Sequence, residues 1–175
     1  IKGISWQKGD HVIYSKQEYG AMQQMILQVT HENQLDTTVL SIPKDPKNDD
    51  EIVSLYKKAI KPETKLILVS HMINITGHIL PIKKICDMAH ASSVKVFVDG
   101  AHCVGHFTFS GESLNCDYYG SSLHKWLATP LGAGLLYVDS EHIPNIWPLI
   151  ADHEKNPTKI EKGSRLALGG SRRHP

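Results

Sequence analysis

Strand-like and helix-like segments alternate along most of this chain, and this alternation limits the possible folds more than any other feature of the sequence. Short runs rich in apolar and β-branched residues predict strands at 11–14, 37–42, 64–69, 94–98, 117–120 and 133–138. A strand followed by a helix and then by another strand is typical of a parallel sheet with helices packed on its faces. The sequence therefore predicts an α/β domain with a mostly parallel sheet.

Three amphipathic helices are predicted between these strands. They begin near Glu18, Asn48 and Pro81, and apolar residues then recur at spacings of three and four. Asn48 is followed three residues later by Glu51, the pattern of a capped helix start, and Pro81 suits the first position of a helix. The residues expected to face the core are Met22, Met25, Ile26 and Val29; Ile52, Leu55, Tyr56 and Ala59; and Ile82, Ile85, Cys86 and Ala89.

Length and composition exclude several classes of protein. The 175 residues have room for one domain with a full core, and not for two ordinary domains. The 19 Lys and Arg residues nearly balance the 18 Asp and Glu residues, so we expect no nucleic-acid partner. No apolar run reaches the roughly 18 residues needed to span a bilayer, so we expect no membrane partner. Cys86, Cys103 and Cys116 are odd in number and lie in or beside predicted elements, which favours a reducing compartment, the cytoplasm.

Two residues near the ends of predicted strands have the character of reactive groups. Asp99 directly follows the apolar run 94–98, at the edge where open α/β sheets bind ligands. A carboxylate there suits a protonated heteroaromatic nitrogen, or it caps the turn that follows. Lys125 lies between His124 and the apolar pair 126–127, where desolvation favours the neutral, nucleophilic amine. The alternative for Lys125 is an ordinary surface lysine.

A zinc site is the alternative from a different class of function. Asp99, His102, Cys103 and His106 lie close together in the sequence, and all three residue types bind zinc. However, no paired Cys-x-x-Cys or His-Glu-x-x-His spacing appears, and zinc leaves Lys125 unexplained. His102 considered alone also fits a hydrogen-bonded histidine of the core.

Four segments, taken in order, resemble the class V aminotransferase family. They are Asp-Gly-Ala-His at 99–102, Cys-Asp-Tyr-Tyr-Gly at 116–120, Ser-Leu-His-Lys-Trp-Leu at 122–127 and Pro-Leu-Gly-Ala-Gly-Leu-Leu-Tyr at 130–137. The family consists of pyridoxal-phosphate enzymes of fold type I and includes cysteine desulfurases and selenocysteine lyases. The His-Lys-Trp-Leu run most resembles the isopenicillin N epimerase-like branch. The resemblance implies a three-layer α/β/α large domain, present here in part.

The resemblance also implies roles for individual residues. Lys125 would form the Schiff base with pyridoxal phosphate, and Asp99 would keep the ring nitrogen protonated so that the ring absorbs carbanion charge. His102 would lie close to the ring and its phenolic oxygen. Ser122 and His124 match residues that hold the cofactor phosphate.

Two upstream residues are weaker matches to the same family. Tyr19 corresponds to the side chain that stacks on the pyridine face, although a tyrosine at the start of a helix is often simply packed. Asn74 corresponds to the asparagine that hydrogen-bonds the phenolic oxygen in the desulfurase branch, or it is a turn residue before Gly77.

The chain is expected to be a piece of a longer protein, since it begins at Ile1 and ends in a stretch rich in Gly, Arg and Ser. We expect 1–150 to be part of the cofactor-binding large domain and 151–175 to be an irregular tail, with the family's first phosphate loop and its small domain lacking. Arg165 only faintly resembles the family's substrate-binding arginine.

The resemblance implies a pyridoxal-phosphate enzyme that acts on an amino acid by transamination, epimerisation or cysteine desulfurase/C–S lyase chemistry. It also implies a homodimer with the site at the subunit boundary. The alternative within the same fold is a catalytically incomplete remnant.

Overall fold

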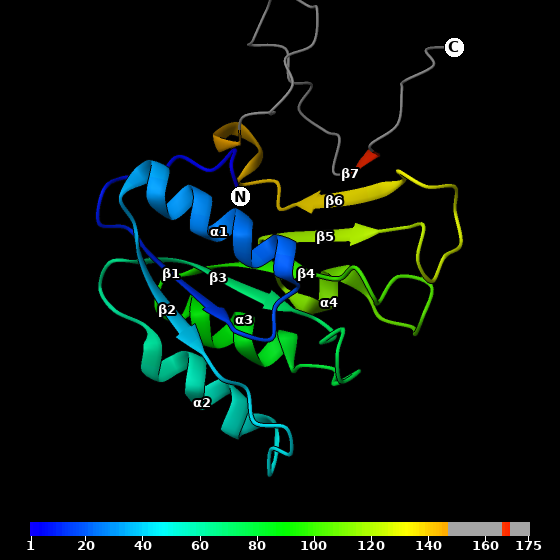
Figure 1. The fold of residues 1–175 in the computed structure, drawn as a ribbon, viewed down its shortest axis with the longest axis horizontal. Coiled ribbons are helices and arrows are strands. Elements are labelled where there is room, and N and C mark those ends of the chain that lie inside the picture. Colours follow the sequence, from blue (N-terminus) through cyan, green and yellow to red (C-terminus); the bar gives the residue numbers. More distant parts are fainter. Residues whose placement is uncertain (147–165, 169–175) are drawn as a thin grey trace, which may run out of the picture.

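The computed structural model describes residues 1–146 and 166–168. The strands in this part of the chain are β1 (His11–Ser15), β2 (Asp36–Leu40), β3 (Thr64–Ser70), β4 (Lys95–Asp99), β5 (Tyr118–Ser122), β6 (Gly134–Val138) and β7 (Leu166–Leu168). They form one sheet in the order β2-β1-β3-β4-β5-β6-β7 (Figure 1). The first five strands are parallel, whereas β6 is antiparallel to β5 and β7 is antiparallel to β6. The predicted α/β class with a mostly parallel sheet is confirmed.

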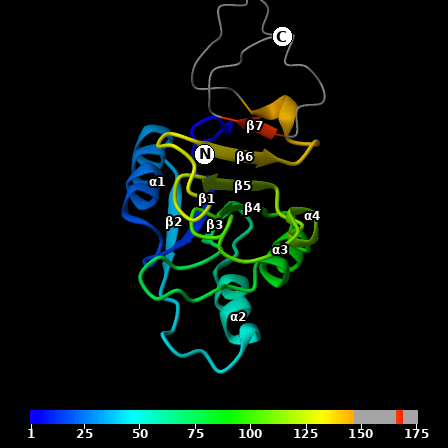
Figure 2. The ribbon, with the colours of Figure 1, turned by 90° about the vertical axis from the view of Figure 1, so that its right-hand side faces the viewer.

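The helices of the described residues are α1 (Gly20–Asn33), α2 (Asp49–Ala59), α3 (Ile82–His90), the short α4 (Gly111–Leu114) and the 3-10 turn η1 (Ile143–Asn145). One face of the sheet is covered by α1 and the other by α2, α3 and α4, which makes three layers (Figure 2). None of these helices is long and apolar enough to cross a bilayer.

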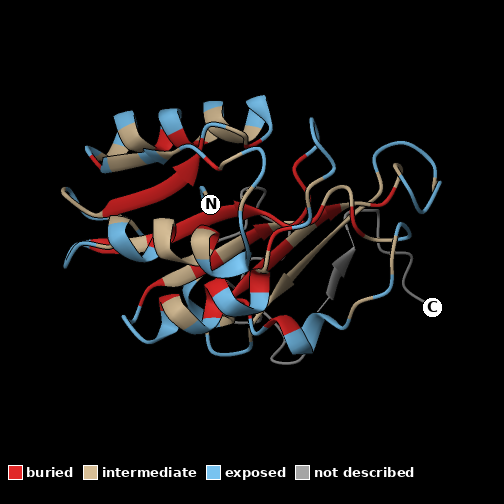
Figure 3. Ribbon diagram, turned by 90° about the horizontal axis from the view of Figure 1, so that it is seen from below, coloured by how far each residue is buried: buried red, intermediate tan, exposed pale blue. Residues whose placement is uncertain are grey.

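The core consists of two apolar layers, one on each face of the sheet. In β3, Leu66 and Leu68 pack on the α1 side with Ile26, whereas Ile67 and Val69 pack on the side of α2 and α3. This alternation follows from the two-residue period of a strand. Because both faces are covered, β1 and nearly all of β3 are buried, whereas buried and half-buried residues alternate in β4 (Figure 3). Of the residues predicted to face the core, Met22, Met25, Leu55 and Ala59 are half-buried and the rest are buried.

The local signals at the helix starts are mostly confirmed. The backbone N–H of Glu51 donates to Asn48 Oδ1 at 3.0 Å, and Pro81 directly precedes α3. In contrast, α1 begins at Gly20 and not at Glu18. The Glu18 N–H instead closes a turn onto the carbonyl oxygen of Ser15, and its side chain points into the protein. Glu18 is therefore a buried residue of the loop that precedes the helix.

Besides the 3-10 turn η1, two further elements were not expected from the sequence. The helix α4 follows the turns after β4, and β7 lies within the segment 151–175, which was expected to be irregular. The residues of that segment other than 166–168, Arg165 among them, lie outside the described part of the chain.

Candidate functional site

The carboxyl ends of the central strands meet at one edge of the sheet. In the parallel register, Ser70 at the end of β3 lies opposite Asp99 at the end of β4, and Asp99 lies opposite Gly120 of β5. The loops that leave β1, β3, β4 and β5 therefore gather at this edge, where open α/β sheets bind ligands. Predicted site residues lie on each of these four loops or at the strand ends beside them.

Lys125, His102 and Tyr19 come together at this edge from three different loops. Lys125 Nζ lies 3.0 Å from His102 Nε2 and 5.6 Å from the centroid of the Tyr19 ring. The indole N–H of Trp126 donates to His102 Nδ1 at 3.3 Å, and the ring of His106 stacks on Trp126 at 3.9 Å. One imidazole ring and one phenol ring thus lie against the lysine amine.

The imidazole of His102 links Lys125 to Trp126. Desolvation lowers the pKa of His102, the Lys125 charge lowers it further, and Asp99 opposes both effects. His102 thus accepts the indole N–H of Trp126 at Nδ1, and its Nε2 faces the Lys125 amine.

Asp99 caps a turn with one carboxylate oxygen. Its Oδ1 accepts a hydrogen bond of 3.0 Å from the Ala101 N–H, and Oδ2 has no hydrogen-bond partner among the described residues. The glycine that follows is required by packing, since a Cβ on Gly100 would lie 2.1 Å from the Tyr119 ring. Asp99 therefore closes a turn through Oδ1, and its role toward a ring nitrogen stays a prediction.

A second glycine holds the loop that carries the lysine. Gly105 has φ of +83°, and a Cβ there would lie 2.8 Å from the backbone nitrogen of Leu127. The loop after β4 and the loop after β5 therefore approach each other backbone to backbone. This contact fixes Lys125 relative to His102.

The remaining predicted residues make fewer contacts with this cluster. Ser122 ends β5 and is half-buried, and the His124 Nδ1 lies 3.3 Å from the carbonyl oxygen of Ala133. Asn74 is exposed in the turn between Ile73 and His78. No described contact joins the Asn74 side chain to Lys125 or Asp99, and its predicted role stays a prediction.

Comparison with known proteins identifies the family of this fold. The family model described as Aminotransferase class-V matches residues 1–160. This chain belongs to the class-V aminotransferase family.

Individual relatives support the same assignment. The chain is 35% identical over 130 residues to an isopenicillin N epimerase from Amycolatopsis lactamdurans, covering 74% of this chain and 33% of the relative. It is 33% identical over 144 residues to a cysteine desulfurase from Dickeya dadantii, covering 82% of this chain and 34% of the relative. The chain spans about a third of the length of the curated relatives it matches.

A solved structure shares the fold. The protein C-DES, in a mutant form with glycine covalently linked to its pyridoxal-phosphate cofactor, superposes with a TM-score of 0.78 at 24% identity. The match covers 84% of this chain and 39% of that one. The class-V aminotransferase family uses pyridoxal phosphate, which confirms the predicted family, fold type and cofactor class.

The zinc alternative is not supported by the structure of this family member. No group of three or more His, Cys, Asp or Glu side chains within the described ranges is arranged to hold a metal ion. Cys103 is fully buried, and burial raises the pKa of its thiol to about 11. His102 and His106 are engaged with Lys125 and Trp126. Closeness in the sequence did not produce a common ligand centre, because Cys103 is buried while His102 and His106 both contact Trp126.

Sequence reasoning missed two buried titratable residues at the same edge. Glu18 lies directly before Tyr19 and is 3% exposed. His71 follows β3, lies 3.0 Å through Nδ1 from the Tyr119 hydroxyl, and contacts Phe107 and Phe109 edge-on. Burial lowers the pKa of His71 to about 4, so its imidazole is neutral near pH 7. Their only signal in the sequence was that each lies within three residues of the end of a strand.

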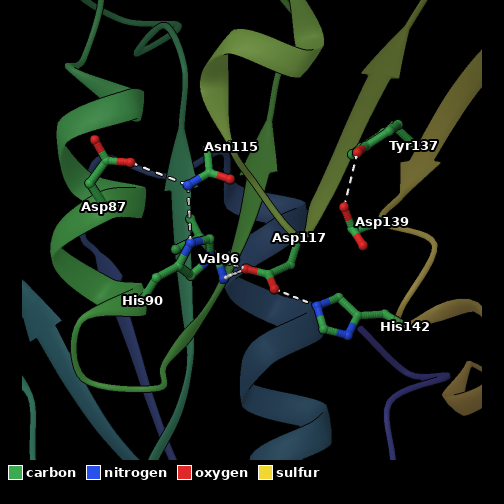
Figure 4. Close-up of polar contacts among 8 residues, drawn as sticks. All are labelled: Asp87, His90, Val96, Asn115, Asp117, Tyr137, Asp139 and His142. Carbon is green, nitrogen blue, oxygen red and sulfur yellow. Dashed lines mark hydrogen bonds and ion pairs between the residues drawn. The ribbon is translucent and has the colours of Figure 1, made fainter.

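A second polar cluster lies at the opposite edge of the sheet (Figure 4). Asp117, directly before β5, is buried and accepts hydrogen bonds of 2.8 Å from His90 and 2.5 Å from His142. It also accepts a bond of 2.7 Å from the backbone N–H of Val96. This Asp117 cluster joins the end of α3, the start of β4 and the turn after β6, at the end of the strands away from Lys125. Its contacts are those of a structural link.

Proposed function

We propose that the protein containing this chain is a pyridoxal-phosphate-dependent enzyme that acts on an amino acid and binds the cofactor covalently through Lys125. The observation that carries the proposal is the position of the Lys125 amine. It lies 3.0 Å from the neutral imidazole of His102 and above the Tyr19 ring, at the strand edge that also presents Asp99. Membership of the class-V aminotransferase family supports it.

The residues at this edge fit the cofactor chemically. The Oδ2 atom of Asp99, with no described partner, suits a protonated ring nitrogen. The Tyr19 ring, 52% exposed, offers a flat surface for a pyridine ring. We assign Ser122 and His124 to the phosphate group and Asn74 to the phenolic oxygen, as the family resemblance implies.

The described side chains provide the proton-transfer chemistry that such a reaction needs. Pyridoxal phosphate, when bound, supplies an electron sink for negative charge at the α-carbon of an amino acid. Lys125 is positioned as the base that removes the α-proton and returns it. His102 Nε2 lies 3.0 Å from the lysine amine and positions it. Asp99 would hold the protonated ring nitrogen.

The reaction begins with this shared step at Lys125, and the named relatives diverge after it. Epimerisation would return a proton to the other face of the α-carbon, and C–S lyase chemistry would expel the β-substituent. Desulfurase chemistry would pass the sulfur to an acceptor thiol, and transamination would release a keto acid while the amino group stays with the cofactor. Isopenicillin N epimerases and cysteine desulfurases among the relatives support an amino-acid substrate class that includes all three.

We also propose that the protein is a homodimer located in the cytoplasm, with its site at the subunit boundary. Trp126, Leu127 and Leu131 expose large apolar side chains near Lys125, with Leu131 90% exposed, which supports a protein partner there. The three cysteines are free and buried, which supports a reducing compartment. Light scattering of the purified protein measures its mass, and a monomer would contradict this assignment.

Covalent trapping tests the cofactor assignment. The protein is reconstituted with pyridoxal phosphate, reduced with borohydride and digested, and the labelled peptide is identified by mass spectrometry. We expect the label on Lys125, and Lys125→Ala should lose both the label and exchange of the substrate α-proton with deuterated water. The exposed Lys8 serves as the control, and Lys8→Ala should retain both. A label on another lysine, or none after reconstitution, would refute the proposal.

A further inference from the structure

Glu18 is a buried carboxyl group at this edge that the proposed function does not use. It lies in the turn between β1 and α1, with only 3% of its surface exposed. Its Oε1 accepts a hydrogen bond of 2.9 Å from Ser15 Oγ, and its Oε2 accepts one of 2.5 Å from Ser70 Oγ. Because Ser70 lies opposite Asp99 in the register of β3 and β4, the carboxyl group of Glu18 spans the ends of β1 and β3 beside Asp99.

The hydrogen-bond directions suit a carboxylate. Ser15 Oγ accepts a bond from the Gln17 N–H, which leaves its own proton to be donated to Glu18, and Ser70 also donates. A carboxylate offers an acceptor oxygen to each hydroxyl, whereas an amide side chain offers only one oxygen. Within the described ranges, no lysine, arginine or histidine forms an ion pair with Glu18. A buried carboxyl group without a cation is costly, and such groups are concentrated at functional sites.

The titratable groups that face Glu18 add no positive charge. Asp99 approaches from β4, and the fully buried Tyr56 approaches from α2. Burial raises the pKa of Glu18 to about 7, the hydrogen bonds from Ser70 and Ser15 oppose this change, and the charge of Asp99 adds to it. A cation placed beside Asp99 would offset the increase that the Asp99 charge causes in the Glu18 pKa, and would favour the ionised form of Glu18.

We propose that Glu18 is a positioning residue of the cofactor site. Its carboxyl group lies beside Asp99 and releases its proton to solvent when a protonated pyridine ring binds at Asp99. The ring nitrogen is then held by the field of two carboxylates rather than one. The inference rests on the proposed function, since it requires a pyridinium group at Asp99. It adds a role for a residue that does not itself contact the ring.

The number of protons released on cofactor binding tests this role. Pyridoxal phosphate is titrated into the cofactor-free protein at pH 7 by calorimetry, in buffers with different ionisation enthalpies. With a pKa of about 7, Glu18 is about half protonated before binding. Glu18→Gln should therefore release about half a proton less per site than the wild type. It should also bind pyridoxal phosphate on the order of tenfold more weakly, the size of one pKa unit.

Ser70→Ala is the matched control variant. It removes one hydrogen bond to Glu18 but keeps the carboxyl group, so Glu18 is more protonated at pH 7 and proton release should rise above that of the wild type. A purely structural role would weaken binding in both variants and leave the proton number unchanged. If Glu18→Gln does not fold, the rise in proton release by Ser70→Ala still tests the role of Glu18.

The outcomes separate the two proposals. Wild-type protein that binds pyridoxal phosphate at Lys125, with the same proton number as both variants, would overturn the role of Glu18 and leave the proposed function standing. Wild-type protein that binds no pyridoxal phosphate at all would overturn both. Opposite changes in proton release for Glu18→Gln and Ser70→Ala would support the role of Glu18.

Discussion

The charge of Glu18 should also be visible in the stability of the cofactor-free protein. Burial raises the pKa of this carboxyl group from its ordinary value of 4.5 to about 7 in the folded state. Between these two values the folded protein binds more protons than the unfolded chain, so Glu18 makes the free energy of unfolding fall as the pH rises. Below about pH 4.5 the group is protonated in both states and has no such effect.

The size of the effect follows from the two pKa values. The difference between 4.5 and about 7 corresponds to about 3 kcal/mol, since one pKa unit is worth about 1.4 kcal/mol. Glu18→Gln removes this pH dependence and loses one acceptor for the serine hydroxyls, at a pH-independent cost of about 1 kcal/mol. The variant should therefore be less stable than the wild type near pH 4.5 and more stable by about 2 kcal/mol above pH 8.

His71 changes the free energy of unfolding with pH in the opposite direction, so its contribution must be separated from that of Glu18. Burial lowers the pKa of His71 to about 4, so its neutral form stabilises the folded state as the pH rises from about 4 to about 6.5. The wild-type stability curve therefore combines two opposing effects. The difference between the curves of Glu18→Gln and the wild type cancels the contribution of His71, because both proteins contain it.

Urea unfolding followed by tryptophan fluorescence at a series of pH values from 4.5 to 8.5 measures this difference. Glu32→Gln is the control, since Glu32 is an exposed carboxyl group of α1; its curve should run parallel to that of the wild type. A difference between Glu18→Gln and the wild type that stays constant over this range would show that Glu18 is ionised throughout, and would refute the reasoning.

Two further substitutions, measured by urea unfolding, test the packing at Gly100 and the hydrogen bonds of the Asp117 cluster. Gly100→Ala places a Cβ about 2.1 Å from the Tyr119 ring and should destabilise the fold by about 2 kcal/mol. The control Gly111→Ala has open space around the new Cβ and should leave stability unchanged. Equal effects of the two substitutions would contradict the packing argument. Asp117→Asn leaves the Asp117 cluster with one acceptor oxygen for three donors and should lower the free energy of unfolding by about 2 to 3 kcal/mol. A decrease below about 0.5 kcal/mol, the range of ordinary surface changes, would show that the cluster is not a structural link.

The local elements were predictable because their causes are local. Apolar spacing predicted β1, β3 and α3, and the Asn48 and Glu51 pair predicted the start of α2, since a capping hydrogen bond spans only three residues. The start of α1 was misplaced by two residues. The reason is tertiary: the Glu18 side chain is held by Ser70, 52 positions away in the sequence, and sequence spacing alone gives no sign of that contact.

The sequence by itself determined the α/β class and the family, and it predicted Asp99 and Lys125 as the centre of the proposed site. It could do so because strand ends in a parallel sheet fall at a common edge, and because the lysine stands in a motif specific to its family. Only the tertiary structure decided which groups touch them. The bond from Trp126 to His102, the position of Glu18 beside Asp99, and the Asp117 cluster all join loops from different strands, and their geometry is set by the packing of the sheet and its covering helices.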